Sequence, residues 1–283
     1  MKILVTGAAG QLGHDVIKLF GENNELSVIG LDRQQLDVTS VEDCEAILNS
    51  VRPDVIIHCA AYTAVDQAEK EEDLAYSVNA FGARNLAVVA EKIGAKICYI
   101  STDYVFDGTK NVPYKEYDRK EPINVYGHSK HAGEELVSSL SSRYFIVRTS
   151  WVYGSHGHNF VKTMLKLALE KGQLKVVDDQ FGSPTYTKDL AKFLLALIKT
   201  EQFGIYHATN TGSCSWFEFA KAIMEEKKLN VSVEPCSSKE YPRPAPRPAY
   251  SVMDHQAIRS NRLEDLRPWR DALKEFLCEL GSL

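Results

Sequence analysis

The sequence predicts an α/β protein in which a doubly wound parallel sheet is followed by a smaller C-terminal α/β lobe. Over the first 150 residues, short β-branched runs alternate with longer amphipathic segments. Each run is apolar nearly throughout, as in strands buried on both faces of a parallel sheet. After residue 150 the alternation gives way to helical stretches separated by polar or proline-bearing loops. These observations favour one large sheet with a second, smaller lobe beside it.

The elements follow in this order. We expect strands at 2–6, 26–31, 54–59, 96–101 and 144–149. Between them we expect a helix near Leu12, one from a Ser40 cap, one over about 73–92 and one around Tyr126. Later helices are predicted near 159–171, 187–199, 215–228 and 269–281. The proline-rich stretch 241–250 fits neither a helix nor a central strand, so it should be a surface loop that binds or connects.

The composition is that of an ordinary soluble globular protein, with 283 residues, 44% hydrophobic and 25% charged. A net charge of -5 gives no electrostatic reason to bind nucleic acid or an anionic membrane. The apolar runs are too short to span a bilayer and the N-terminus lacks a signal-peptide pattern, so we expect a cytoplasmic protein. The six cysteines have no metal-like spacing, and we expect free thiols and no metal site.

The turn "VTGAAGQLGHDV" (5–16) joins the first strand to the first helix and carries glycines at 7, 10 and 13. A dinucleotide pyrophosphate needs a tight turn, backbone without side chains and free N–H groups at a helix N-terminus. Gly7 would make the turn, Gly10 the close approach and Gly13 the helix–strand contact, with Gln11 and Leu12 beside them. The strand–turn–helix context predicts dinucleotide binding.

Two further segments extend this predicted cofactor site. Asp32 lies about 20 residues past the glycines, where an acid binds the adenosine ribose of NAD, whereas Arg33 would suit the extra phosphate of NADP. The choice between NADPH and NADH therefore stays open. The remaining candidates flank the adenine or lie under the ribose and nicotinamide: Asp37, Val38, Ala60, Ala61, Tyr62 and Thr63.

We accordingly assign residues 1–150 to a dinucleotide-binding Rossmann domain. Residues 151–283 would form mainly a substrate-binding lobe, with some segments returning to the first domain.

The chemistry is predicted from Thr102, Tyr126 and Lys130. Thr102 follows the fourth strand at the carboxyl edge of the sheet, where open α/β sheets bind ligands. Tyr126 and Lys130 are one helical turn apart and share a face. A lysine ammonium beside the phenol would lower its pKa, and a threonine hydroxyl sharing the substrate oxygen would complete a general acid for carbonyl reduction. About one Y-x-x-x-K motif is expected by chance, so the position of this one carries the prediction.

The glycine turn, "STDYVF" (101–106), "NVYGHSKHAGE" (124–134) and "RTSWVYG" (148–154) together resemble the extended short-chain dehydrogenase/reductases. More narrowly, the chain resembles the dTDP-4-dehydrorhamnose reductase family. The likeness covers nearly the whole chain and includes four more discriminating stretches: "RPDVIIHCAAYTAVD", "NFVKTML", "DDQFGSPT" and "RPAPRPAYS".

The resemblance implies reduction of the 4-keto group of dTDP-4-dehydro-β-L-rhamnose to dTDP-L-rhamnose by NADPH or NADH. It implies that Tyr126 donates the proton and that Lys130 also holds the nicotinamide ribose. It places Asp103 and Trp151 against the sugar, Asn159 in support of the nucleotide and Arg247 at the diphosphate. An aromatic face suits a sugar and an arginine fork suits phosphate.

Two departures from related patterns narrow the expectation. The sugar-nucleotide 4,6-dehydratases carry Asp–Glu after the threonine, whereas Tyr104 stands at the second position here and cannot be an anionic base at neutral pH. Some family members dimerise through magnesium held by glutamates, but the matching positions here are Asp15, Lys188 and Glu279. A lysine in such a cluster repels the cation, so we expect a monomer or a weak homodimer.

The rival interpretation is a cofactor-binding regulatory subunit, because relatives of this family serve as the non-catalytic partner of methionine adenosyltransferase. Another nucleotide-sugar reductase or an epimerase is the nearer alternative. An intact Thr102–Tyr126–Lys130 set favours catalysis, because a binding-only protein does not need a tuned phenol. The sequence leaves open which 6-deoxy-4-keto sugar is the substrate.

Overall fold

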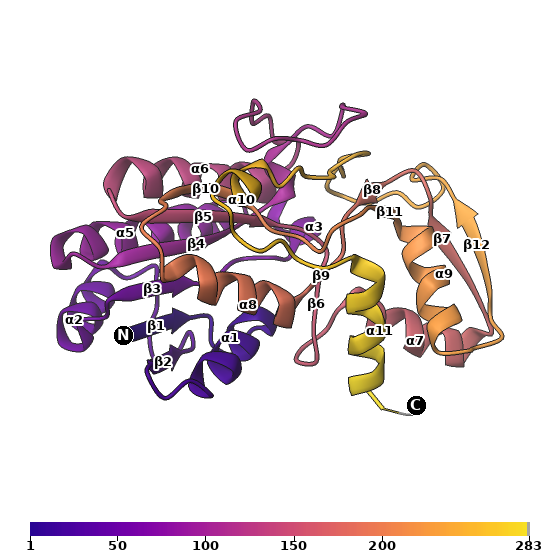
Figure 1. The fold of residues 1–283 in the computed structure, drawn as a ribbon. Helices are drawn as coiled ribbons and strands as arrows, with labels where there is room; N and C mark the ends of the chain where they lie inside the picture. The colour runs from indigo at the N-terminus through magenta and orange to yellow at the C-terminus, as the bar shows by residue number, and fades with distance from the viewer. Residues whose placement is uncertain (282–283) are drawn as a thin grey trace.

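The large sheet predicted from the sequence is present and is parallel throughout. The structure, a computed structural model, describes residues 1–281, so the last two residues of the predicted C-terminal lobe lie outside it. Within that range the sheet has six strands in the order β10-β5-β4-β3-β1-β2 (Figure 1). The strands are β1 (Lys2–Thr6), β2 (Ser27–Leu31), β3 (Val55–His58), β4 (Lys96–Thr102), β5 (Tyr144–Thr149) and β10 (Gly204–His207).

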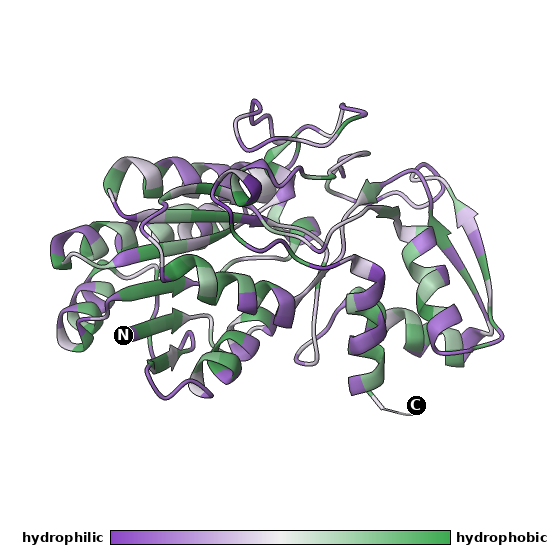
Figure 2. Cartoon of the chain, in the orientation of Figure 1, coloured by the Kyte–Doolittle hydropathy of each residue, from purple (hydrophilic) through white to green (hydrophobic). Residues whose placement is uncertain are grey.

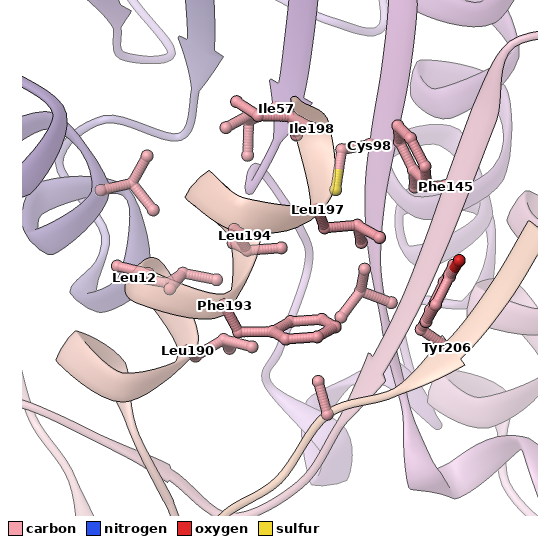
Figure 3. Packing of buried hydrophobic residues seen from close by; sticks show 14 of the residues in the cluster. Leu12, Ile57, Cys98, Phe145, Leu190, Phe193, Leu194, Leu197, Ile198 and Tyr206 are labelled. Carbon is pink, nitrogen blue, oxygen red and sulfur yellow. The ribbon is translucent and has the colours of Figure 1, made fainter. Parts of the chain in front are cut away.

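Alternate residues of each strand point to opposite faces, and helices cover both. On one face, Ile3 and Val5 of β1 pack with α1 (Gln11–Gly21) and α8 (Thr187–Ile198). Figure 3 shows that face, with Phe193 and Leu197 of α8 lying over the strands. The other face is covered by helices that bury Leu4 and its neighbours: α2 (Val41–Val51), α5 (Gly82–Ile93) and α6 (Val125–Leu140).

The helix predicted over 73–92 is interrupted by a π-helical turn. It consists of α4 (Glu72–Tyr76), the π segment η1 (Ser77–Phe81) and then α5. The buried side chain of Asn79 accepts a hydrogen bond from the Tyr62 N–H at 2.8 Å and donates to Tyr62 O and Ser129 Oγ, both at 3.0 Å. Such contacts between distant segments favour the wider turn, and no local sequence pattern encodes them.

Several segments beyond residue 150 pack on the large sheet. The strand β10 was not predicted, because four residues in a polar context give little signal. It pairs with β5, and α8 and the short α10 (Gln256–Ser260) bury side chains in the same core cluster. Two further short elements lie near the carboxyl edge of the sheet: α3 (Val65–Ala68) and the 3₁₀ turn η2 (Asp103–Val105).

A second core lies in the smaller lobe, on the right of Figure 1. There β7 (Gln173–Val177) pairs with β12 (Ser232–Cys236), and Phe219 and Phe276 lie in the core that the lobe's helices bury. These helices are α7 (Phe160–Lys171), α9 (Trp216–Glu226) and α11 (Trp269–Glu279). Two further short strand pairs lie within residues 152–215: β6 (Val152–Tyr153) with β9 (Thr185–Tyr186), and β8 (Phe181–Gly182) with β11 (Cys214–Ser215).

Hydrophobic residues concentrate in the strands of the large sheet and on the inner faces of its helices (Figure 2). Over residues 1–281 we find no helix with the length and apolar character needed to cross a membrane. All six cysteines are free, as predicted.

Candidate active site

The strand order reverses between β1 and β3, and open α/β sheets bind ligands at such a point. Three cavities lie along this edge and share residues. The central cavity, of about 460 Å³, contains the glycine turn and the end of β4. The β2 cavity, of about 310 Å³, lies beyond β1 and shares Gly7 and Gly10 with it. The interlobe cavity, of about 480 Å³, opens toward the small lobe and shares Tyr104 and Trp216 with the central one.

The glycine turn forms a cradle that side chains would fill. Gly7 has a φ of 66°, and a Cβ there would lie 2.5 Å from the Ala60 nitrogen. A Cβ on Gly13 would overlap with the carbonyl oxygen of Gly7, and Gly10 donates to that oxygen at 2.9 Å. The first turn of α1 lines the cavity through Gln11 and its neighbours, with the unpaired N–H groups of a helix start. The geometry fits a pyrophosphate held on backbone.

The remaining cofactor candidates line the two cavities beside this turn, and Ala61 lines both. Ala61 and Thr63 lie in the central cavity. The β2 cavity is lined by Asp32, Arg33, Asp37, Val38, Ala60 and Tyr62. Asp32 Oδ1 accepts hydrogen bonds from the Gln34 and Gln35 N–H groups at 2.9 and 3.1 Å. Hydrogen bonds from Thr39 lower the pKa of Asp37, so this carboxylate also supports its own turn.

Close approach of α6 to β4 brings Tyr126 and Lys130 to the central cavity. Asn124 caps the helix by accepting from the Gly127 N–H at 2.8 Å. A Cβ on Gly127 would overlap with Tyr104 O, and one on Gly133 would overlap with Asn79 O. These two glycines therefore allow the helix to lie directly against the end of β4 and the π turn.

Tyr126 and Thr102 line the central cavity together. Burial raises the pKa of Tyr126 to about 12, and a hydrogen bond with Thr102 partly opposes this. The expected lowering by Lys130 is therefore not what the structure shows. The phenol is neutral at pH 7, which is the form that donates a proton in a reduction.

Lys130 is buried and bonds to the backbone of β4. Its Nζ donates to Ile100 O at 2.6 Å and lies 4.0 Å from the centre of the Tyr99 ring. Burial lowers the pKa of this amine to about 7, while Glu134 and Cys59 act in the opposite direction. The side chain thus lines the central cavity while its amine is tied to the end of β4.

Asp103 is a buried carboxyl beside the Tyr126–Thr102 pair. Its Oδ1 accepts from Thr102 at 3.0 Å, and its Oδ2 has no hydrogen-bond partner although it is buried. Burial raises its pKa to about 6, against hydrogen bonds from Ser251 and Thr102. An unpaired buried oxygen lining a cavity is available to a ligand hydroxyl.

Trp151 lines the central cavity in a strained conformation. Its φ of 48° is rare for a bulky residue. The indole stacks on Trp216, with ring centres 3.5 Å apart, and a Cβ on Gly182 would be 2.6 Å from it. Trp216 was not predicted: it begins α9 after the Ser215 cap, where a tryptophan usually joins the core.

Arg247 lines the interlobe cavity, as expected for its loop, but it already has an acidic partner. Its Nη1 lies 2.9 Å from Asp66 Oδ1 and donates to Ala245 O at 2.7 Å. Burial acts to raise the pKa of Asp66, but the hydrogen bond and positive charge of Arg247 help to lower it below its ordinary value. Arg243 lines the same cavity. The sequence analysis did not identify Asp66 or Arg243 as site residues. Asp66 is far from both arginines in the chain, and only the packed fold brings the three side chains to one cavity.

Asn159 lies apart from the cavity walls. It caps α7 by accepting from the Lys162 N–H at 3.1 Å. Its amide nitrogen donates to Gln11 Oε1 at 3.0 Å and to Gly154 O at 2.8 Å. The side chain therefore joins the start of α7 to the first turn of α1, and it does not line any of the three cavities.

The residues considered for a metal ion have protein partners. Lys188 pairs with Glu279, and Thr187 donates to Asp15. In the described part of the chain, no three His, Cys, Asp or Glu side chains gather closely enough to hold a metal.

Known proteins resemble this chain in both sequence and fold. The family model described as "RmlD substrate binding domain" matches residues 1–282. The chain is 46% identical to the spore coat polysaccharide biosynthesis protein SpsK of Bacillus subtilis (strain 168), over 99% of this chain and 98% of that protein. It is 43% identical to the dTDP-4-dehydrorhamnose reductase of Aggregatibacter actinomycetemcomitans, over 97% and 98%. The dTDP-4-dehydrorhamnose reductase of Bacillus anthracis str. Ames, solved in complex with NADP, superimposes with a TM-score of 0.95 at 48% identity, covering 98% and 99%.

Proposed function

The chain belongs to the RmlD family of NAD(P)-dependent dTDP-sugar 4-ketoreductases, and we propose that it reduces the 4-keto group of dTDP-4-dehydro-β-L-rhamnose to dTDP-L-rhamnose. NADPH is the proposed hydride donor. One observation supports this most strongly: Thr102, Tyr126 and Lys130 line the same cavity as the glycine turn.

The proposed reaction divides between the cofactor and the protein. Bound NADPH would supply a hydride to carbon 4 of the sugar. The neutral phenol of Tyr126 gives its proton to the carbonyl oxygen, while the Thr102 hydroxyl holds that oxygen. The amine of Lys130, which lines the same cavity, would hold the nicotinamide ribose. The unpaired Asp103 oxygen accepts from a ring hydroxyl of the sugar, with Trp151 against the ring.

The interlobe cavity is the proposed site of the nucleoside diphosphate. It combines aromatic side chains, Phe160, Trp216 and Tyr241, with the guanidinium groups of Arg243 and Arg247. Aromatic faces suit a thymine ring, and arginine forks suit phosphate oxygens. Because it shares Tyr104 and Trp216 with the central cavity, one ligand can occupy both. This supports residues 1–150 as the dinucleotide-binding part and 151–283 as mainly the substrate part, although Asp66 contributes from the first.

Arg247→Ala is expected to raise the KM for the dTDP-sugar by about 10–100-fold, because it removes a charge-assisted contact to phosphate. The effect on kcat should be smaller, since the reacting atoms lie in the other cavity. Arg119→Ala, which alters a highly exposed arginine paired with Glu121, is the matched control. Initial rates across substrate concentration measure both. An unchanged KM in Arg247→Ala would contradict the proposed phosphate contact.

Arg33→Ala is expected to lower the affinity for NADPH by about tenfold and to leave that for NADH nearly unchanged. The reason is that Arg33 lines the β2 cavity, while Asp32 Oδ1 is engaged by its own turn. Titration of the intrinsic fluorescence with each dinucleotide measures the two affinities. Equal losses for both cofactors would show that Arg33 does not read the extra phosphate.

The function itself is tested by mixing the protein with NADPH and dTDP-4-dehydro-β-L-rhamnose. Absorbance reports cofactor consumption, and NMR of the product identifies dTDP-L-rhamnose. Faster turnover of another dTDP-4-keto-6-deoxy sugar would reassign the substrate within the same reaction class. Tight NADPH binding with no turnover of any such sugar would instead favour the regulatory-subunit alternative.

A further inference from the structure

Three residues on one face of α6 contact three consecutive residues at the end of β4. The helix residues Tyr126, Lys130 and Glu134 are four apart and so share a face. Lys130 Nζ donates to Ile100 O at 2.6 Å, and Ser101 Oγ donates to Glu134 Oε1 at 2.5 Å. Tyr126 has its hydrogen bond with Thr102. The register of the helix on the strand is thus set at three successive points.

Glu134 is also tied to β5 by a buried ion pair. Arg148 donates to its two carboxylate oxygens, from Nε at 2.8 Å and from Nη2 at 2.7 Å, in a two-pronged arrangement. Both side chains are almost completely buried. The other guanidinium nitrogen donates to Glu116 O at 3.1 Å and lies 3.2 Å from His207 Nε2 on β10.

A buried ion pair contributes little net stability, because removing two charges from water costs about as much as their attraction returns. Its geometry is nevertheless rigid, because displacing either partner leaves a buried charge without compensation. Here the ion pair and the Ser101 hydroxyl together connect α6, β4 and β5, one helical turn after Lys130. Gly133, next to Glu134, lets the helix approach closely enough for these contacts.

We propose that the Glu134–Arg148 pair, together with Ser101, is a positioning device that holds α6 in register with the end of β4 and keeps Lys130 aimed at the central cavity as a cation. The inference rests on the proposed function, because the register matters only if Tyr126 and Lys130 act on a bound ketone and dinucleotide. Glu134 touches neither ligand and acts through Lys130.

The charges around Lys130 make this testable. The groups that influence it are Glu134 on its own helix, and His58 and Cys59 at the end of β3. Burial lowers the pKa of His58 to about 3, so it is neutral. Burial raises the pKa of Cys59 to about 12, so it is a neutral thiol. Glu134 is therefore the carboxylate that favours the charged amine.

The charged and titratable groups around Glu134 also bear on this test. Glu134 faces Arg148 on β5 and His131 on α6 itself, and His207 on β10 lies against Arg148. Burial holds the pKa of His207 well below its ordinary value and lowers that of His131 as well. Both rings are thus neutral near pH 7, and the charge facing Glu134 is that of Arg148.

The experiment compares Glu134→Gln with Ser101→Ala and with the control Glu135→Gln, whose side chain is mostly exposed on the same helix. Removing the Glu134 charge lowers the pKa of Lys130, so the ammonium is lost at a lower pH. The alkaline limb of kcat/KM should therefore move to lower pH by about one unit. Ser101→Ala keeps the charge but loosens the register, so it should lower kcat about tenfold without moving that limb. Glu135→Gln should match wild type.

A second measurement does not depend on turnover. The titration of Lys130, followed by NMR of lysine labelled at the ε-carbon, should shift downward in Glu134→Gln alone. If Glu134→Gln does not fold, the double variant Glu134→Gln/Arg148→Met removes the uncompensated charge and should still shift the titration downward, by a smaller amount because a cation is removed as well. An equal loss of rate at every pH with an unmoved Lys130 titration would overturn the proposal. Failure of the wild type to reduce any dTDP-4-keto sugar would overturn the proposed function but leave this titration informative.

Discussion

Tyr126→Phe is expected to lower kcat by about 10²–10⁴-fold, which is the range for losing a positioned general acid. The variant removes one oxygen atom from a partly buried ring. The ring's edge-on contact with Tyr104, with centres 5.8 Å apart, is kept. Cofactor affinity should stay close to that of wild type, because the glycine turn and Lys130 are untouched. Stopped-flow absorbance of bound NADPH after addition of the keto sugar isolates the chemical step.

The control for this variant is Tyr117→Phe, which removes the same oxygen from a ring that is 69% exposed. It should be indistinguishable from wild type. A Tyr126→Phe protein that turns over at near wild-type rate would assign the proton to another group. Asp103 would be the first to test, because burial raises its pKa to about 6 and its Oδ2 is unpaired.

Gly13→Ala is expected to weaken NADPH binding by about 100-fold or more, through overpacking of backbone against backbone. The added Cβ would overlap with the carbonyl oxygen and carbon of Gly7, and neither can rotate away as a side chain could. Either α1 or the turn must shift, and both line the central cavity. Isothermal titration calorimetry with NADPH, alongside thermal unfolding of the protein, separates lost binding from lost folding.

Gly21→Ala is the matched control, since Gly21 ends the same helix and has no atom within 4 Å of its added Cβ. It should bind NADPH normally and be slightly stabilised, because alanine reduces the entropy of the unfolded chain. If Gly13→Ala binds NADPH as tightly as Gly21→Ala does, the cradle is not the pyrophosphate site.

The large sheet could be predicted from the sequence because the patterns that indicate its strands are local. Five strands lie within a residue or so of their predicted bounds, since β-branched runs buried on both faces carry a strong pattern. Four helices after residue 150 were located to within two residues by their apolar periodicity, whereas the short α10 was not predicted. The glycine turn was identifiable because each glycine answers a steric demand within one strand–turn–helix unit. Resemblance to a family then supplied Trp151 and Arg247, which pattern alone would not single out.

Tertiary structure decided the features that depend on contacts between distant segments. The π turn follows from Asn79 bonding to Tyr62 and Ser129. The pKa of Tyr126 rises because burial outweighs nearby polar groups, and burial is a property of the assembled fold.

The same holds for Lys130, whose pKa falls because the amine is buried and whose Nζ donates to Ile100 O. Residue types, spacing and local pattern were enough to predict which elements form and which chemistry they carry. Where each charge is buried, and what faces it, became determinate only when helix, strand and loop were packed together. The physical reason is that desolvation and hydrogen bonding act through space, between groups that the chain order keeps far apart.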